Sequence, residues 1–142
     1  MKRLLGLDYG AKTVGVAVTD GLGLTAVSLE TIKRSKENHL RATYRRIEEL
    51  IAEYDVKLMV VGLPLNMDGT EGERAKLAGK FASELTKRIG IETVMQDERL
   101  TTVEADEIIE ATGNHKKDRK AHIDAMAAAI MLTDYLNQHR DS

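Results

Sequence analysis

Residues 3–20 hold the feature that most constrains the fold: two short β-rich runs separated by a glycine turn. The runs cover residues 3–9 (RLLGLDY) and 13–20 (TVGVAVTD), and the tripeptide GAK between them predicts a tight hairpin. In the second run, valines alternate with small residues, so neither face of that strand is strongly polar. A strand of this kind needs cover on both faces. We therefore expect both strands in the interior of a sheet.

The segments that follow predict an α/β fold built on one mixed sheet. A third, edge strand is expected at 24–33, further strands at 57–61 and 91–95, and helices at 35–54, 70–89, 101–112 and 121–137. Three antiparallel strands followed by parallel crossovers give a five-stranded sheet flanked by about four helices. Ser35 is the expected N-cap of the first helix, and Thr70 with Glu73 forms a capping box before the second. Residues 1–142 are expected to form a single domain.

Composition narrows the class of protein further. The chain has no cysteine, which excludes a disulfide scaffold, a zinc ribbon and thiol catalysis. Its net charge of −2 is not that of a protein that coats nucleic acid by bulk charge, so a polyanion would need a local basic patch. No apolar run approaches the ~20 residues that span a bilayer. We expect a cytoplasmic protein without a membrane partner, either a monomer or a weak homodimer.

Three carboxylates stand out from their surroundings. Asp8 lies near the end of the first strand, on the same face as Leu4 and Gly6. Glu98 follows a buried strand, at the carboxyl end where open α/β sheets build their sites. Asp124 is the single charge in the segment IDAMAAAIML. A buried, lone carboxylate is costly unless it is protonated, paired or bound to a cation.

Each carboxylate taken alone also has an ordinary structural explanation. Asp8 could cap the turn at Gly10, Asp124 could interact favourably with a helix dipole, and Glu98 could pair with Arg99. Taken together, three carboxylates on separate elements converge only if a cation offsets their repulsion. Because no His or Cys accompanies them, the set favours Mg²⁺ or Mn²⁺. Two such ions could activate a water and stabilise the leaving oxygen in phosphodiester cleavage.

Four motifs together resemble the YqgF/RuvX family: GLDYGAKTVGVAVTD, VVGLPLNMDGTEG, DERLTT and AHIDAMAAAIML, in this order over essentially the whole chain. The resemblance implies a ribonuclease H-like fold related to the RuvC resolvases, and a metal-dependent nuclease that uses Mg²⁺ or Mn²⁺. It implies maturation of the 5′ end of the 16S ribosomal RNA precursor; an older description of the family as Holliday junction resolvases is the alternative. By motif, Asp8, Glu98 and Asp124 match the family's catalytic and metal-binding carboxylates.

The chain departs from the RuvC pattern at one place. RuvC-type resolvases carry a glutamate after the fourth strand, where this sequence has Gly62, Leu63 and Pro64. Glu98 is one candidate for the missing ligand, and Asp68 and Asp97 are the others.

A cluster of basic residues precedes the helix that carries Asp124. It is expected to hold substrate phosphates beside the metal site, although such a run is often only a solvated loop. The predicted nucleic-acid-binding residues are Lys12, Arg99, Lys116, Lys117, Arg119 and Lys120. The expected partners are nucleic acid, either an rRNA precursor or branched DNA, and ribosomal particles.

Two other functions remain open at this level. The stretch GLDYGAKT also resembles the phosphate loop of actin-like and sugar-kinase ATPases, which would make the chain a nucleotide-binding module. Those ATPases clamp the nucleotide between two such domains, and 142 residues supply one. A ribonuclease H-like protein that binds RNA without cleaving it is the other alternative, because a fold alone does not establish an activity.

Overall fold

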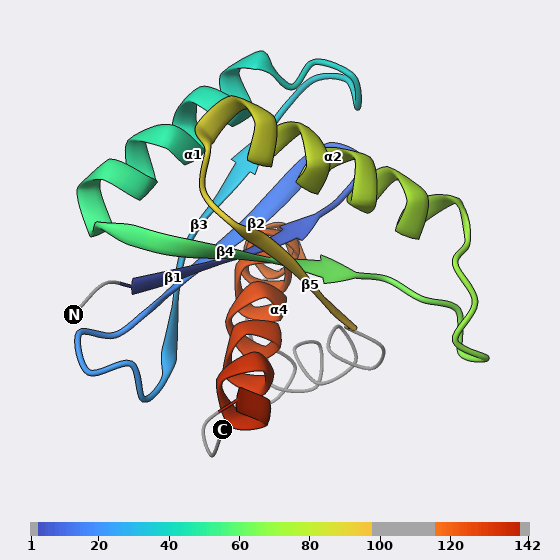
Figure 1. Cartoon of the computed structure of the whole chain (residues 1–142). Helices are drawn as coiled ribbons and strands as arrows, with labels where there is room; N and C mark the ends of the chain where they lie inside the picture. The colour runs from blue at the N-terminus through green and yellow to red at the C-terminus, as the bar shows by residue number, and fades with distance from the viewer. Residues whose placement is uncertain (1–2, 98–115, 140–142) are drawn as a thin grey trace.

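A computed structural model describes residues 3–97 and 116–139, and in the last helix it describes the side chains from residue 123 onward. Figure 1 shows a five-stranded sheet with helices on both faces. The elements are β1 (Arg3–Tyr9), β2 (Thr13–Thr19), β3 (Ala26–Lys33), α1 (Arg41–Tyr54), β4 (Val56–Leu63), α2 (Glu73–Ile89), β5 (Thr93–Asp97) and α4 (Lys116–His139). None of the helices within these residues is long and apolar enough to cross a membrane.

The sheet has the mixed topology expected from the sequence. Its strand order is β3-β2-β1-β4-β5, so β1 and β2 are interior and β3 is an edge. The first three strands pair antiparallel, while β4 pairs parallel with both β1 and β5. These features confirm the fold class. Three helices are described, and the further helix expected at 101–112 lies outside the described residues.

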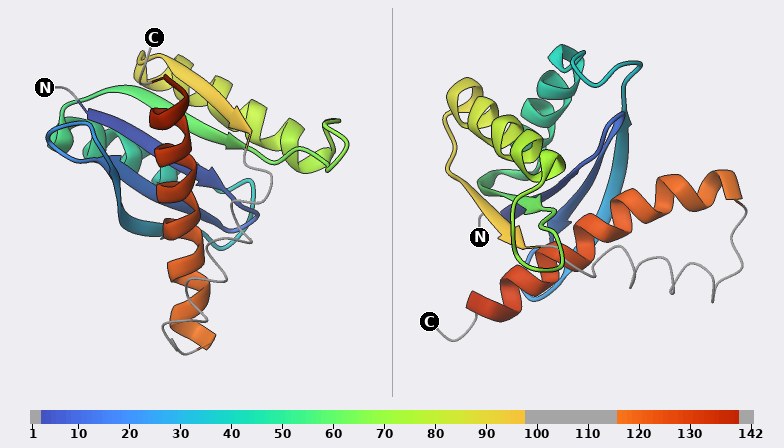
Figure 2. Two further views of the ribbon diagram at one scale, coloured as in Figure 1. Left: turned by 90° about the horizontal axis from the view of Figure 1, so that it is seen from below. Right: turned by 90° about the vertical axis from the view of Figure 1, so that its right-hand side faces the viewer.

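The helices cover the two faces of the sheet unequally, with two helices on one face and one described helix on the other. α1 and α2 cover one face of the sheet, and α4 crosses the other face (Figures 1 and 2). The larger core lies under α1 and α2, and its fully buried members include Leu5, Leu7, Val14, Val16, Ile47 and Leu85. The core under α4 is smaller and contains Ala17, Val60, Ala128, Met131 and Leu132. Small side chains on this second face let α4 lie close to the sheet.

The first helix starts later than the sequence indicated. α1 begins at Arg41 after Leu40, and Ser35 is not its N-cap. The chain just before Ser35 is bound to the β1–β2 turn instead of starting a helix. The backbone N–H of Arg34 donates to the carbonyl of Lys12 at 2.8 Å, and the Arg34 side chain donates to the carbonyl of Gly10 at 2.5 Å. This contact with the β1–β2 turn is far away in sequence, so local helix signals could not reveal it.

The starts of α2 and α4 also differ from expectation. Thr70 does not cap α2, since its hydroxyl donates to Asp68 Oδ1 at 2.6 Å and the helix begins at Glu73 after Gly72. α4 begins at Lys116 rather than near 121. The basic residues expected in a loop therefore form the first turns of this helix.

Candidate metal centre

Gly15 is the point at which Asp8 and Asp124 come together. In the β1–β2 pair, Asp8 lies directly opposite Gly15. A Cβ atom on Gly15 would lie only 1.9 Å from the carbonyl oxygen of Asp124, so the backbone of α4 rests on Gly15 at that residue. Opposite residues of an antiparallel pair project to the same face of the sheet. Asp8 therefore projects to the face that carries Asp124.

The neighbouring residues of β1 confirm this orientation. A Cβ atom on Gly6 would lie 3.0 Å from Leu132 Cβ and 3.2 Å from the carbonyl oxygen of Ala128, so Gly6 faces α4. Leu7, the next residue, is packed in the core on the opposite face. Because side chains alternate along a strand, Asp8 shares the face of Gly6. The expected common face of Leu4, Gly6 and Asp8 is thus confirmed.

The two aspartates bring half-buried carboxylates to the same face of the sheet. Asp8 and Asp124 are both partly exposed, and the Oδ2 atom of Asp124 is buried. Carboxylate oxygens suit a hard divalent cation, which would also reduce the repulsion between the two groups. Glu98, the third expected ligand, lies outside the described residues. Among the side chains that the structure describes, in residues 3–97 and 123–139, no three His, Cys, Asp or Glu are grouped so as to hold a metal ion.

The structure gives each of the two alternative ligands, Asp68 and Asp97, a local environment of its own. Oδ1 of Asp68 accepts from the backbone N–H of Thr70 at 3.0 Å and from its hydroxyl at 2.6 Å, so it stabilises the turn before α2. Asp97 ends β5 and shares a face with Met95, which packs toward α1 and α2. Neither observation favours these residues over Glu98.

On the other face of the sheet, Tyr9 is fixed by a charged network. Its hydroxyl donates to Glu37 Oε2 at 2.9 Å, and Arg74 Nη1 donates to the same oxygen at 2.9 Å. The guanidinium carbon of Arg34 lies 4.9 Å from the centroid of the Tyr9 ring, and that of Arg74 lies 5.5 Å from it. The network links the end of β1 to the β3–α1 connection and to the first turn of α2.

Two pKa shifts follow from this network. Burial and the hydrogen bond to Glu37 raise the pKa of Tyr9. Burial also acts to raise the pKa of Glu37, but the hydrogen bonds from Tyr9 and Arg74 outweigh it and leave that pKa below its ordinary value. Glu37 is therefore charged in the folded protein at neutral pH, and its carboxylate holds Arg74 beside Tyr9. Arg34 is held by the backbone carbonyl of Glu37, to which its Nε donates at 3.0 Å.

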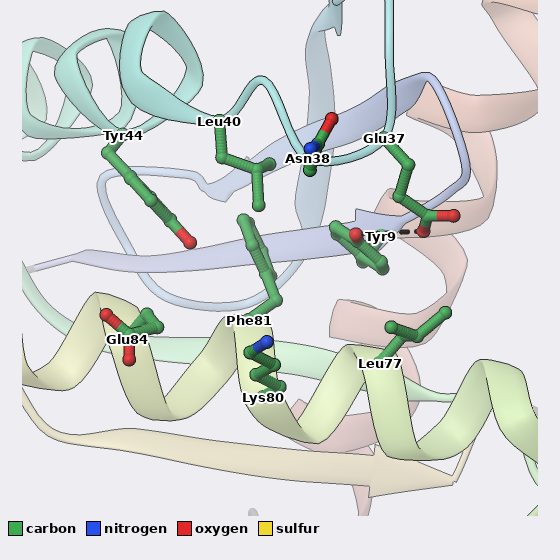
Figure 3. A pocket seen from close by; sticks show the side chains of 9 residues that line it. All are labelled: Tyr9, Glu37, Asn38, Leu40, Tyr44, Leu77, Lys80, Phe81 and Glu84. Atoms are coloured by element: carbon green, nitrogen blue, oxygen red, sulfur yellow. Dashed lines mark hydrogen bonds between the residues drawn. The ribbon is translucent and has the colours of Figure 1, made fainter.

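The network borders a cavity of about 190 Å³ between α1 and α2 (Figure 3). Aromatic rings form much of its wall, with the Tyr9 and Phe81 centroids 4.6 Å apart and the Tyr44 and Phe81 centroids 5.9 Å apart. The lining residues are Tyr9, Glu37, Asn38, Leu40, Tyr44, Leu77, Lys80, Phe81 and Glu84. The cavity lies on the face opposite Asp8 and Asp124, so it is not part of the carboxylate site.

The structure describes the expected nucleic-acid-binding residues to different extents. Lys12 is exposed in the β1–β2 turn, four residues after Asp8. The backbone of Lys116, Lys117, Arg119 and Lys120 forms the start of α4, the helix that carries Asp124. Arg99 lies outside the described residues. The arginines around Tyr9, Arg34 and Arg74, were not among the residues predicted from the sequence. The density of Lys and Arg in residues 33–46 was a usable signal for Arg34, but not for Arg74.

The strand order β3-β2-β1-β4-β5, with α4 lying on the face of the sheet to which Asp8 projects, defines an α/β protein of the ribonuclease H-like class. The structure of T. thermophilus RuvC in complex with a Holliday junction substrate superposes with a TM-score of 0.59 at 17% identity, covering 98% of this chain and 97% of that one. The chain itself belongs to the RuvX family, whose model, described as RuvX Holliday junction resolvase, matches residues 2–138.

Close relatives cover nearly the whole chain. A protein of Lachnospira eligens named "Putative pre-16S rRNA nuclease" is 54% identical over 134 residues, which is 94% of this chain and 96% of the relative. A protein of the same name from Agathobacter rectalis is 48% identical, covering 95% of this chain and 94% of the relative. The expected family and fold are thereby confirmed.

Proposed function

We propose that this chain is a metal-dependent endonuclease that matures the 5′ end of the 16S ribosomal RNA precursor in the cytoplasm. The observation that carries the proposal is the convergence of Asp8 and Asp124 on Gly15, which gives two hard oxygen donors on one face of the sheet. The name of the relatives at 48–54% identity supports the substrate. The family's description as a Holliday junction resolvase makes branched DNA the second candidate substrate.

Each residue has a defined part in this proposal. Asp8, Glu98 and Asp124 would hold Mg²⁺ or Mn²⁺, as one or two ions. When bound, such an ion lowers the pKa of a water and stabilises the leaving oxygen of a phosphodiester. Lys12, Arg99 and the basic residues at the start of α4 would hold the substrate phosphates. Asp8 and Asp124 are oriented by rigid elements, a central strand and a packed helix, so the donors need little reorganisation on binding.

A cleavage assay tests the proposal and its two substrates together. Purified protein is incubated, with and without Mn²⁺, with an RNA that spans the 5′ end of the 16S precursor and with a four-way DNA junction. We expect Mn²⁺-dependent cleavage of the RNA that is lost in Asp8→Asn. Cleavage of the junction alone would move the substrate to DNA. Full activity in Asp8→Asn, or no cleavage of either substrate, would overturn the assignment.

A further inference from the structure

A strongly basic segment lies beside the β1–β2 turn and outside the residues so far linked to substrate. Residues 33–45 (KRSKENHLRATYR) contain five Lys or Arg and one acidic residue, in a chain whose net charge is −2. Four of these cations, Lys33, Lys36, Arg41 and Arg45, are exposed. Together with exposed Lys12 they form what we call the shoulder surface.

The cations of the shoulder surface have no neutralising partner among the residues that the structure describes. The side chains of Lys12, Lys33, Lys36, Arg41 and Arg45 make no ion pair or hydrogen bond with any part of the chain that the structure describes. The one carboxylate of the segment, Glu37, is already bound to Tyr9 and Arg74. Unpaired like charges in one area repel each other, and an anionic partner would relieve that repulsion.

The position of the shoulder surface connects it to the carboxylate site. Two hydrogen bonds from Arg34, to the carbonyls of Lys12 and Gly10, fix the segment against the turn that follows Asp8. Figures 1 and 2 show the β3–α1 connection beside this turn, at the carboxyl end of β1. The surface continues into a hollow at the start of α1, lined by Asn38, His39, Leu40, Arg41, Ala42 and Arg45.

The basic character stops within α1. Beyond Arg46, which pairs with Glu30 at 2.6 Å and with Glu49 at 3.1 Å, the exposed residues include Glu48, Glu49 and Glu53. The cations therefore form a patch that runs from the turn after Asp8 to the first turns of α1, rather than a general property of the helix.

We propose that the shoulder surface binds the phosphodiester backbone of the substrate as it leaves the carboxylate site past the β1–β2 turn. This inference rests on the proposed nuclease function and extends its phosphate-binding surface from Lys12 to the start of α1. A nucleic acid is favoured over an acidic protein because Lys12, one of the cations of the patch, lies in the turn that follows Asp8. Spaced lysines and arginines contact phosphates one by one, without reading bases.

Binding is measured separately from cleavage so that the two proposals can be judged independently. Fluorescence anisotropy follows the labelled 16S-precursor RNA and, in a second arm, the four-way DNA junction, from about 50 to 200 mM salt in the absence of divalent metal. The test variants are Lys33→Gln/Lys36→Gln and Arg41→Gln/Arg45→Gln. The control, Lys57→Gln/Lys87→Gln, removes two exposed cations elsewhere in the molecule.

Each test variant should bind about tenfold more weakly and lower the slope of log affinity against log salt by about 1.5, because two phosphate contacts are lost. The control should change neither quantity. In the cleavage assay, KM should rise while kcat is kept. Arg41→Lys/Arg45→Lys should retain binding, which shows that charge rather than an altered fold is responsible.

The outcomes separate the surface from the nuclease. If both test variants keep the affinity and the salt slope of the parent, the proposal that the shoulder surface binds nucleic acid is overturned, even where the RNA is cleaved. An acidic protein is then the alternative partner of this surface. Binding that depends on the surface, in a protein that cleaves neither substrate, overturns the nuclease and keeps the surface. The arm with the larger change identifies RNA or DNA as the polyanion.

Discussion

At the scale of single residues, the candidate site depends on Gly15, which has no side chain, as much as on its carboxylates. Gly15 leaves the space that the backbone of α4 fills at Asp124, and Asp8 lies directly across from it. Any side chain at this position would have to move the helix or the strand. Gly15 thus sets the separation between the two proposed metal ligands without touching a metal.

Gly15→Ala tests this role. Its Cβ would lie within 1.9 Å of a backbone oxygen, so we expect a loss of about 3 kcal/mol in the free energy of unfolding and a loss of cleavage. Urea denaturation and the RNA cleavage assay measure the two effects.

Gly79→Ala is the matched control, because nothing lies within 4 Å of a Cβ on Gly79 in α2. It should be neutral or stabilise the protein by up to about 1 kcal/mol, with cleavage retained. Equal stability and activity in the two alanine variants would contradict the close contact at Gly15.

The carboxylates themselves give a second prediction. Asp124→Asn should lower cleavage about a thousandfold, since a metal ligand contributes several kcal/mol of transition-state stabilisation. Without metal, the variant should be at least as stable to heat as the parent, because the repulsion between Asp8 and Asp124 is reduced. Single-turnover rates and thermal melts in EDTA check both statements, and a lower melting temperature would argue against a repulsive pair.

At the scale of elements, the Tyr9 network fastens the end of β1 to two connections. Glu37→Gln should lower stability by about 1 kcal/mol at neutral pH, a modest value because the carboxylate is 35% exposed. The pKa of Glu37 is lower in the folded protein than its ordinary value. Its contribution is therefore present above about pH 4.3 and is lost as the pH falls through the folded pKa.

Urea midpoints of the parent and Glu37→Gln, taken from about pH 7 down to about pH 3, measure this linkage. The difference between the two proteins should shrink toward acid pH. Glu53→Gln, on the exposed side of α1, should show no difference at any pH. A gap that widens in acid would mean that the pKa of Glu37 is raised rather than lowered.

The elements also show how far the sequence could be interpreted. The apolar residues of β1 and the alternating valines of β2 predicted two interior strands, and the apolar segment around Asp124 predicted the last helix. Local signals failed where distant contacts compete with them. Ser35 does not cap α1, because the neighbouring Arg34 is bound to the β1–β2 turn. Thr70 does not cap α2, because its hydroxyl donates a hydrogen bond to Asp68 instead.

The candidate site follows the same pattern. Asp8 and Asp124 could be proposed from the sequence because each is a charge among apolar or small residues. The shoulder surface could not, because it depends on which cations lack a partner among the residues that the structure describes. Counting charges over residues 33–46 would have revealed the density of cations, but not their unpaired state.

At the scale of the whole molecule, metal binding should be visible as stability. A ligand at 100 times its Kd stabilises the folded state by about 2.7 kcal/mol. For a domain of this size, that corresponds to a rise of about 8 °C in melting temperature. We expect Mn²⁺ to raise the Tm of the parent protein and of Asp68→Asn, whose carboxylate stabilises a turn, but not of Asp8→Asn.

Differential scanning fluorimetry across a Mn²⁺ titration gives these values without any nucleic acid. If Mn²⁺ no longer raises the Tm of Asp68→Asn, Asp68 is a ligand of the metal site. If Mn²⁺ still raises the Tm of Asp8→Asn, Asp8 is not a ligand.

The contact between Gly15 and α4 has a further consequence for the time at which activity begins. The two aspartates come from the first strand and the last helix, so no partial chain that lacks the helix has both. During translation, the sheet can assemble while the proposed metal-binding pair is still incomplete. We therefore expect the nascent chain to be inactive as a nuclease until α4 docks on the finished sheet.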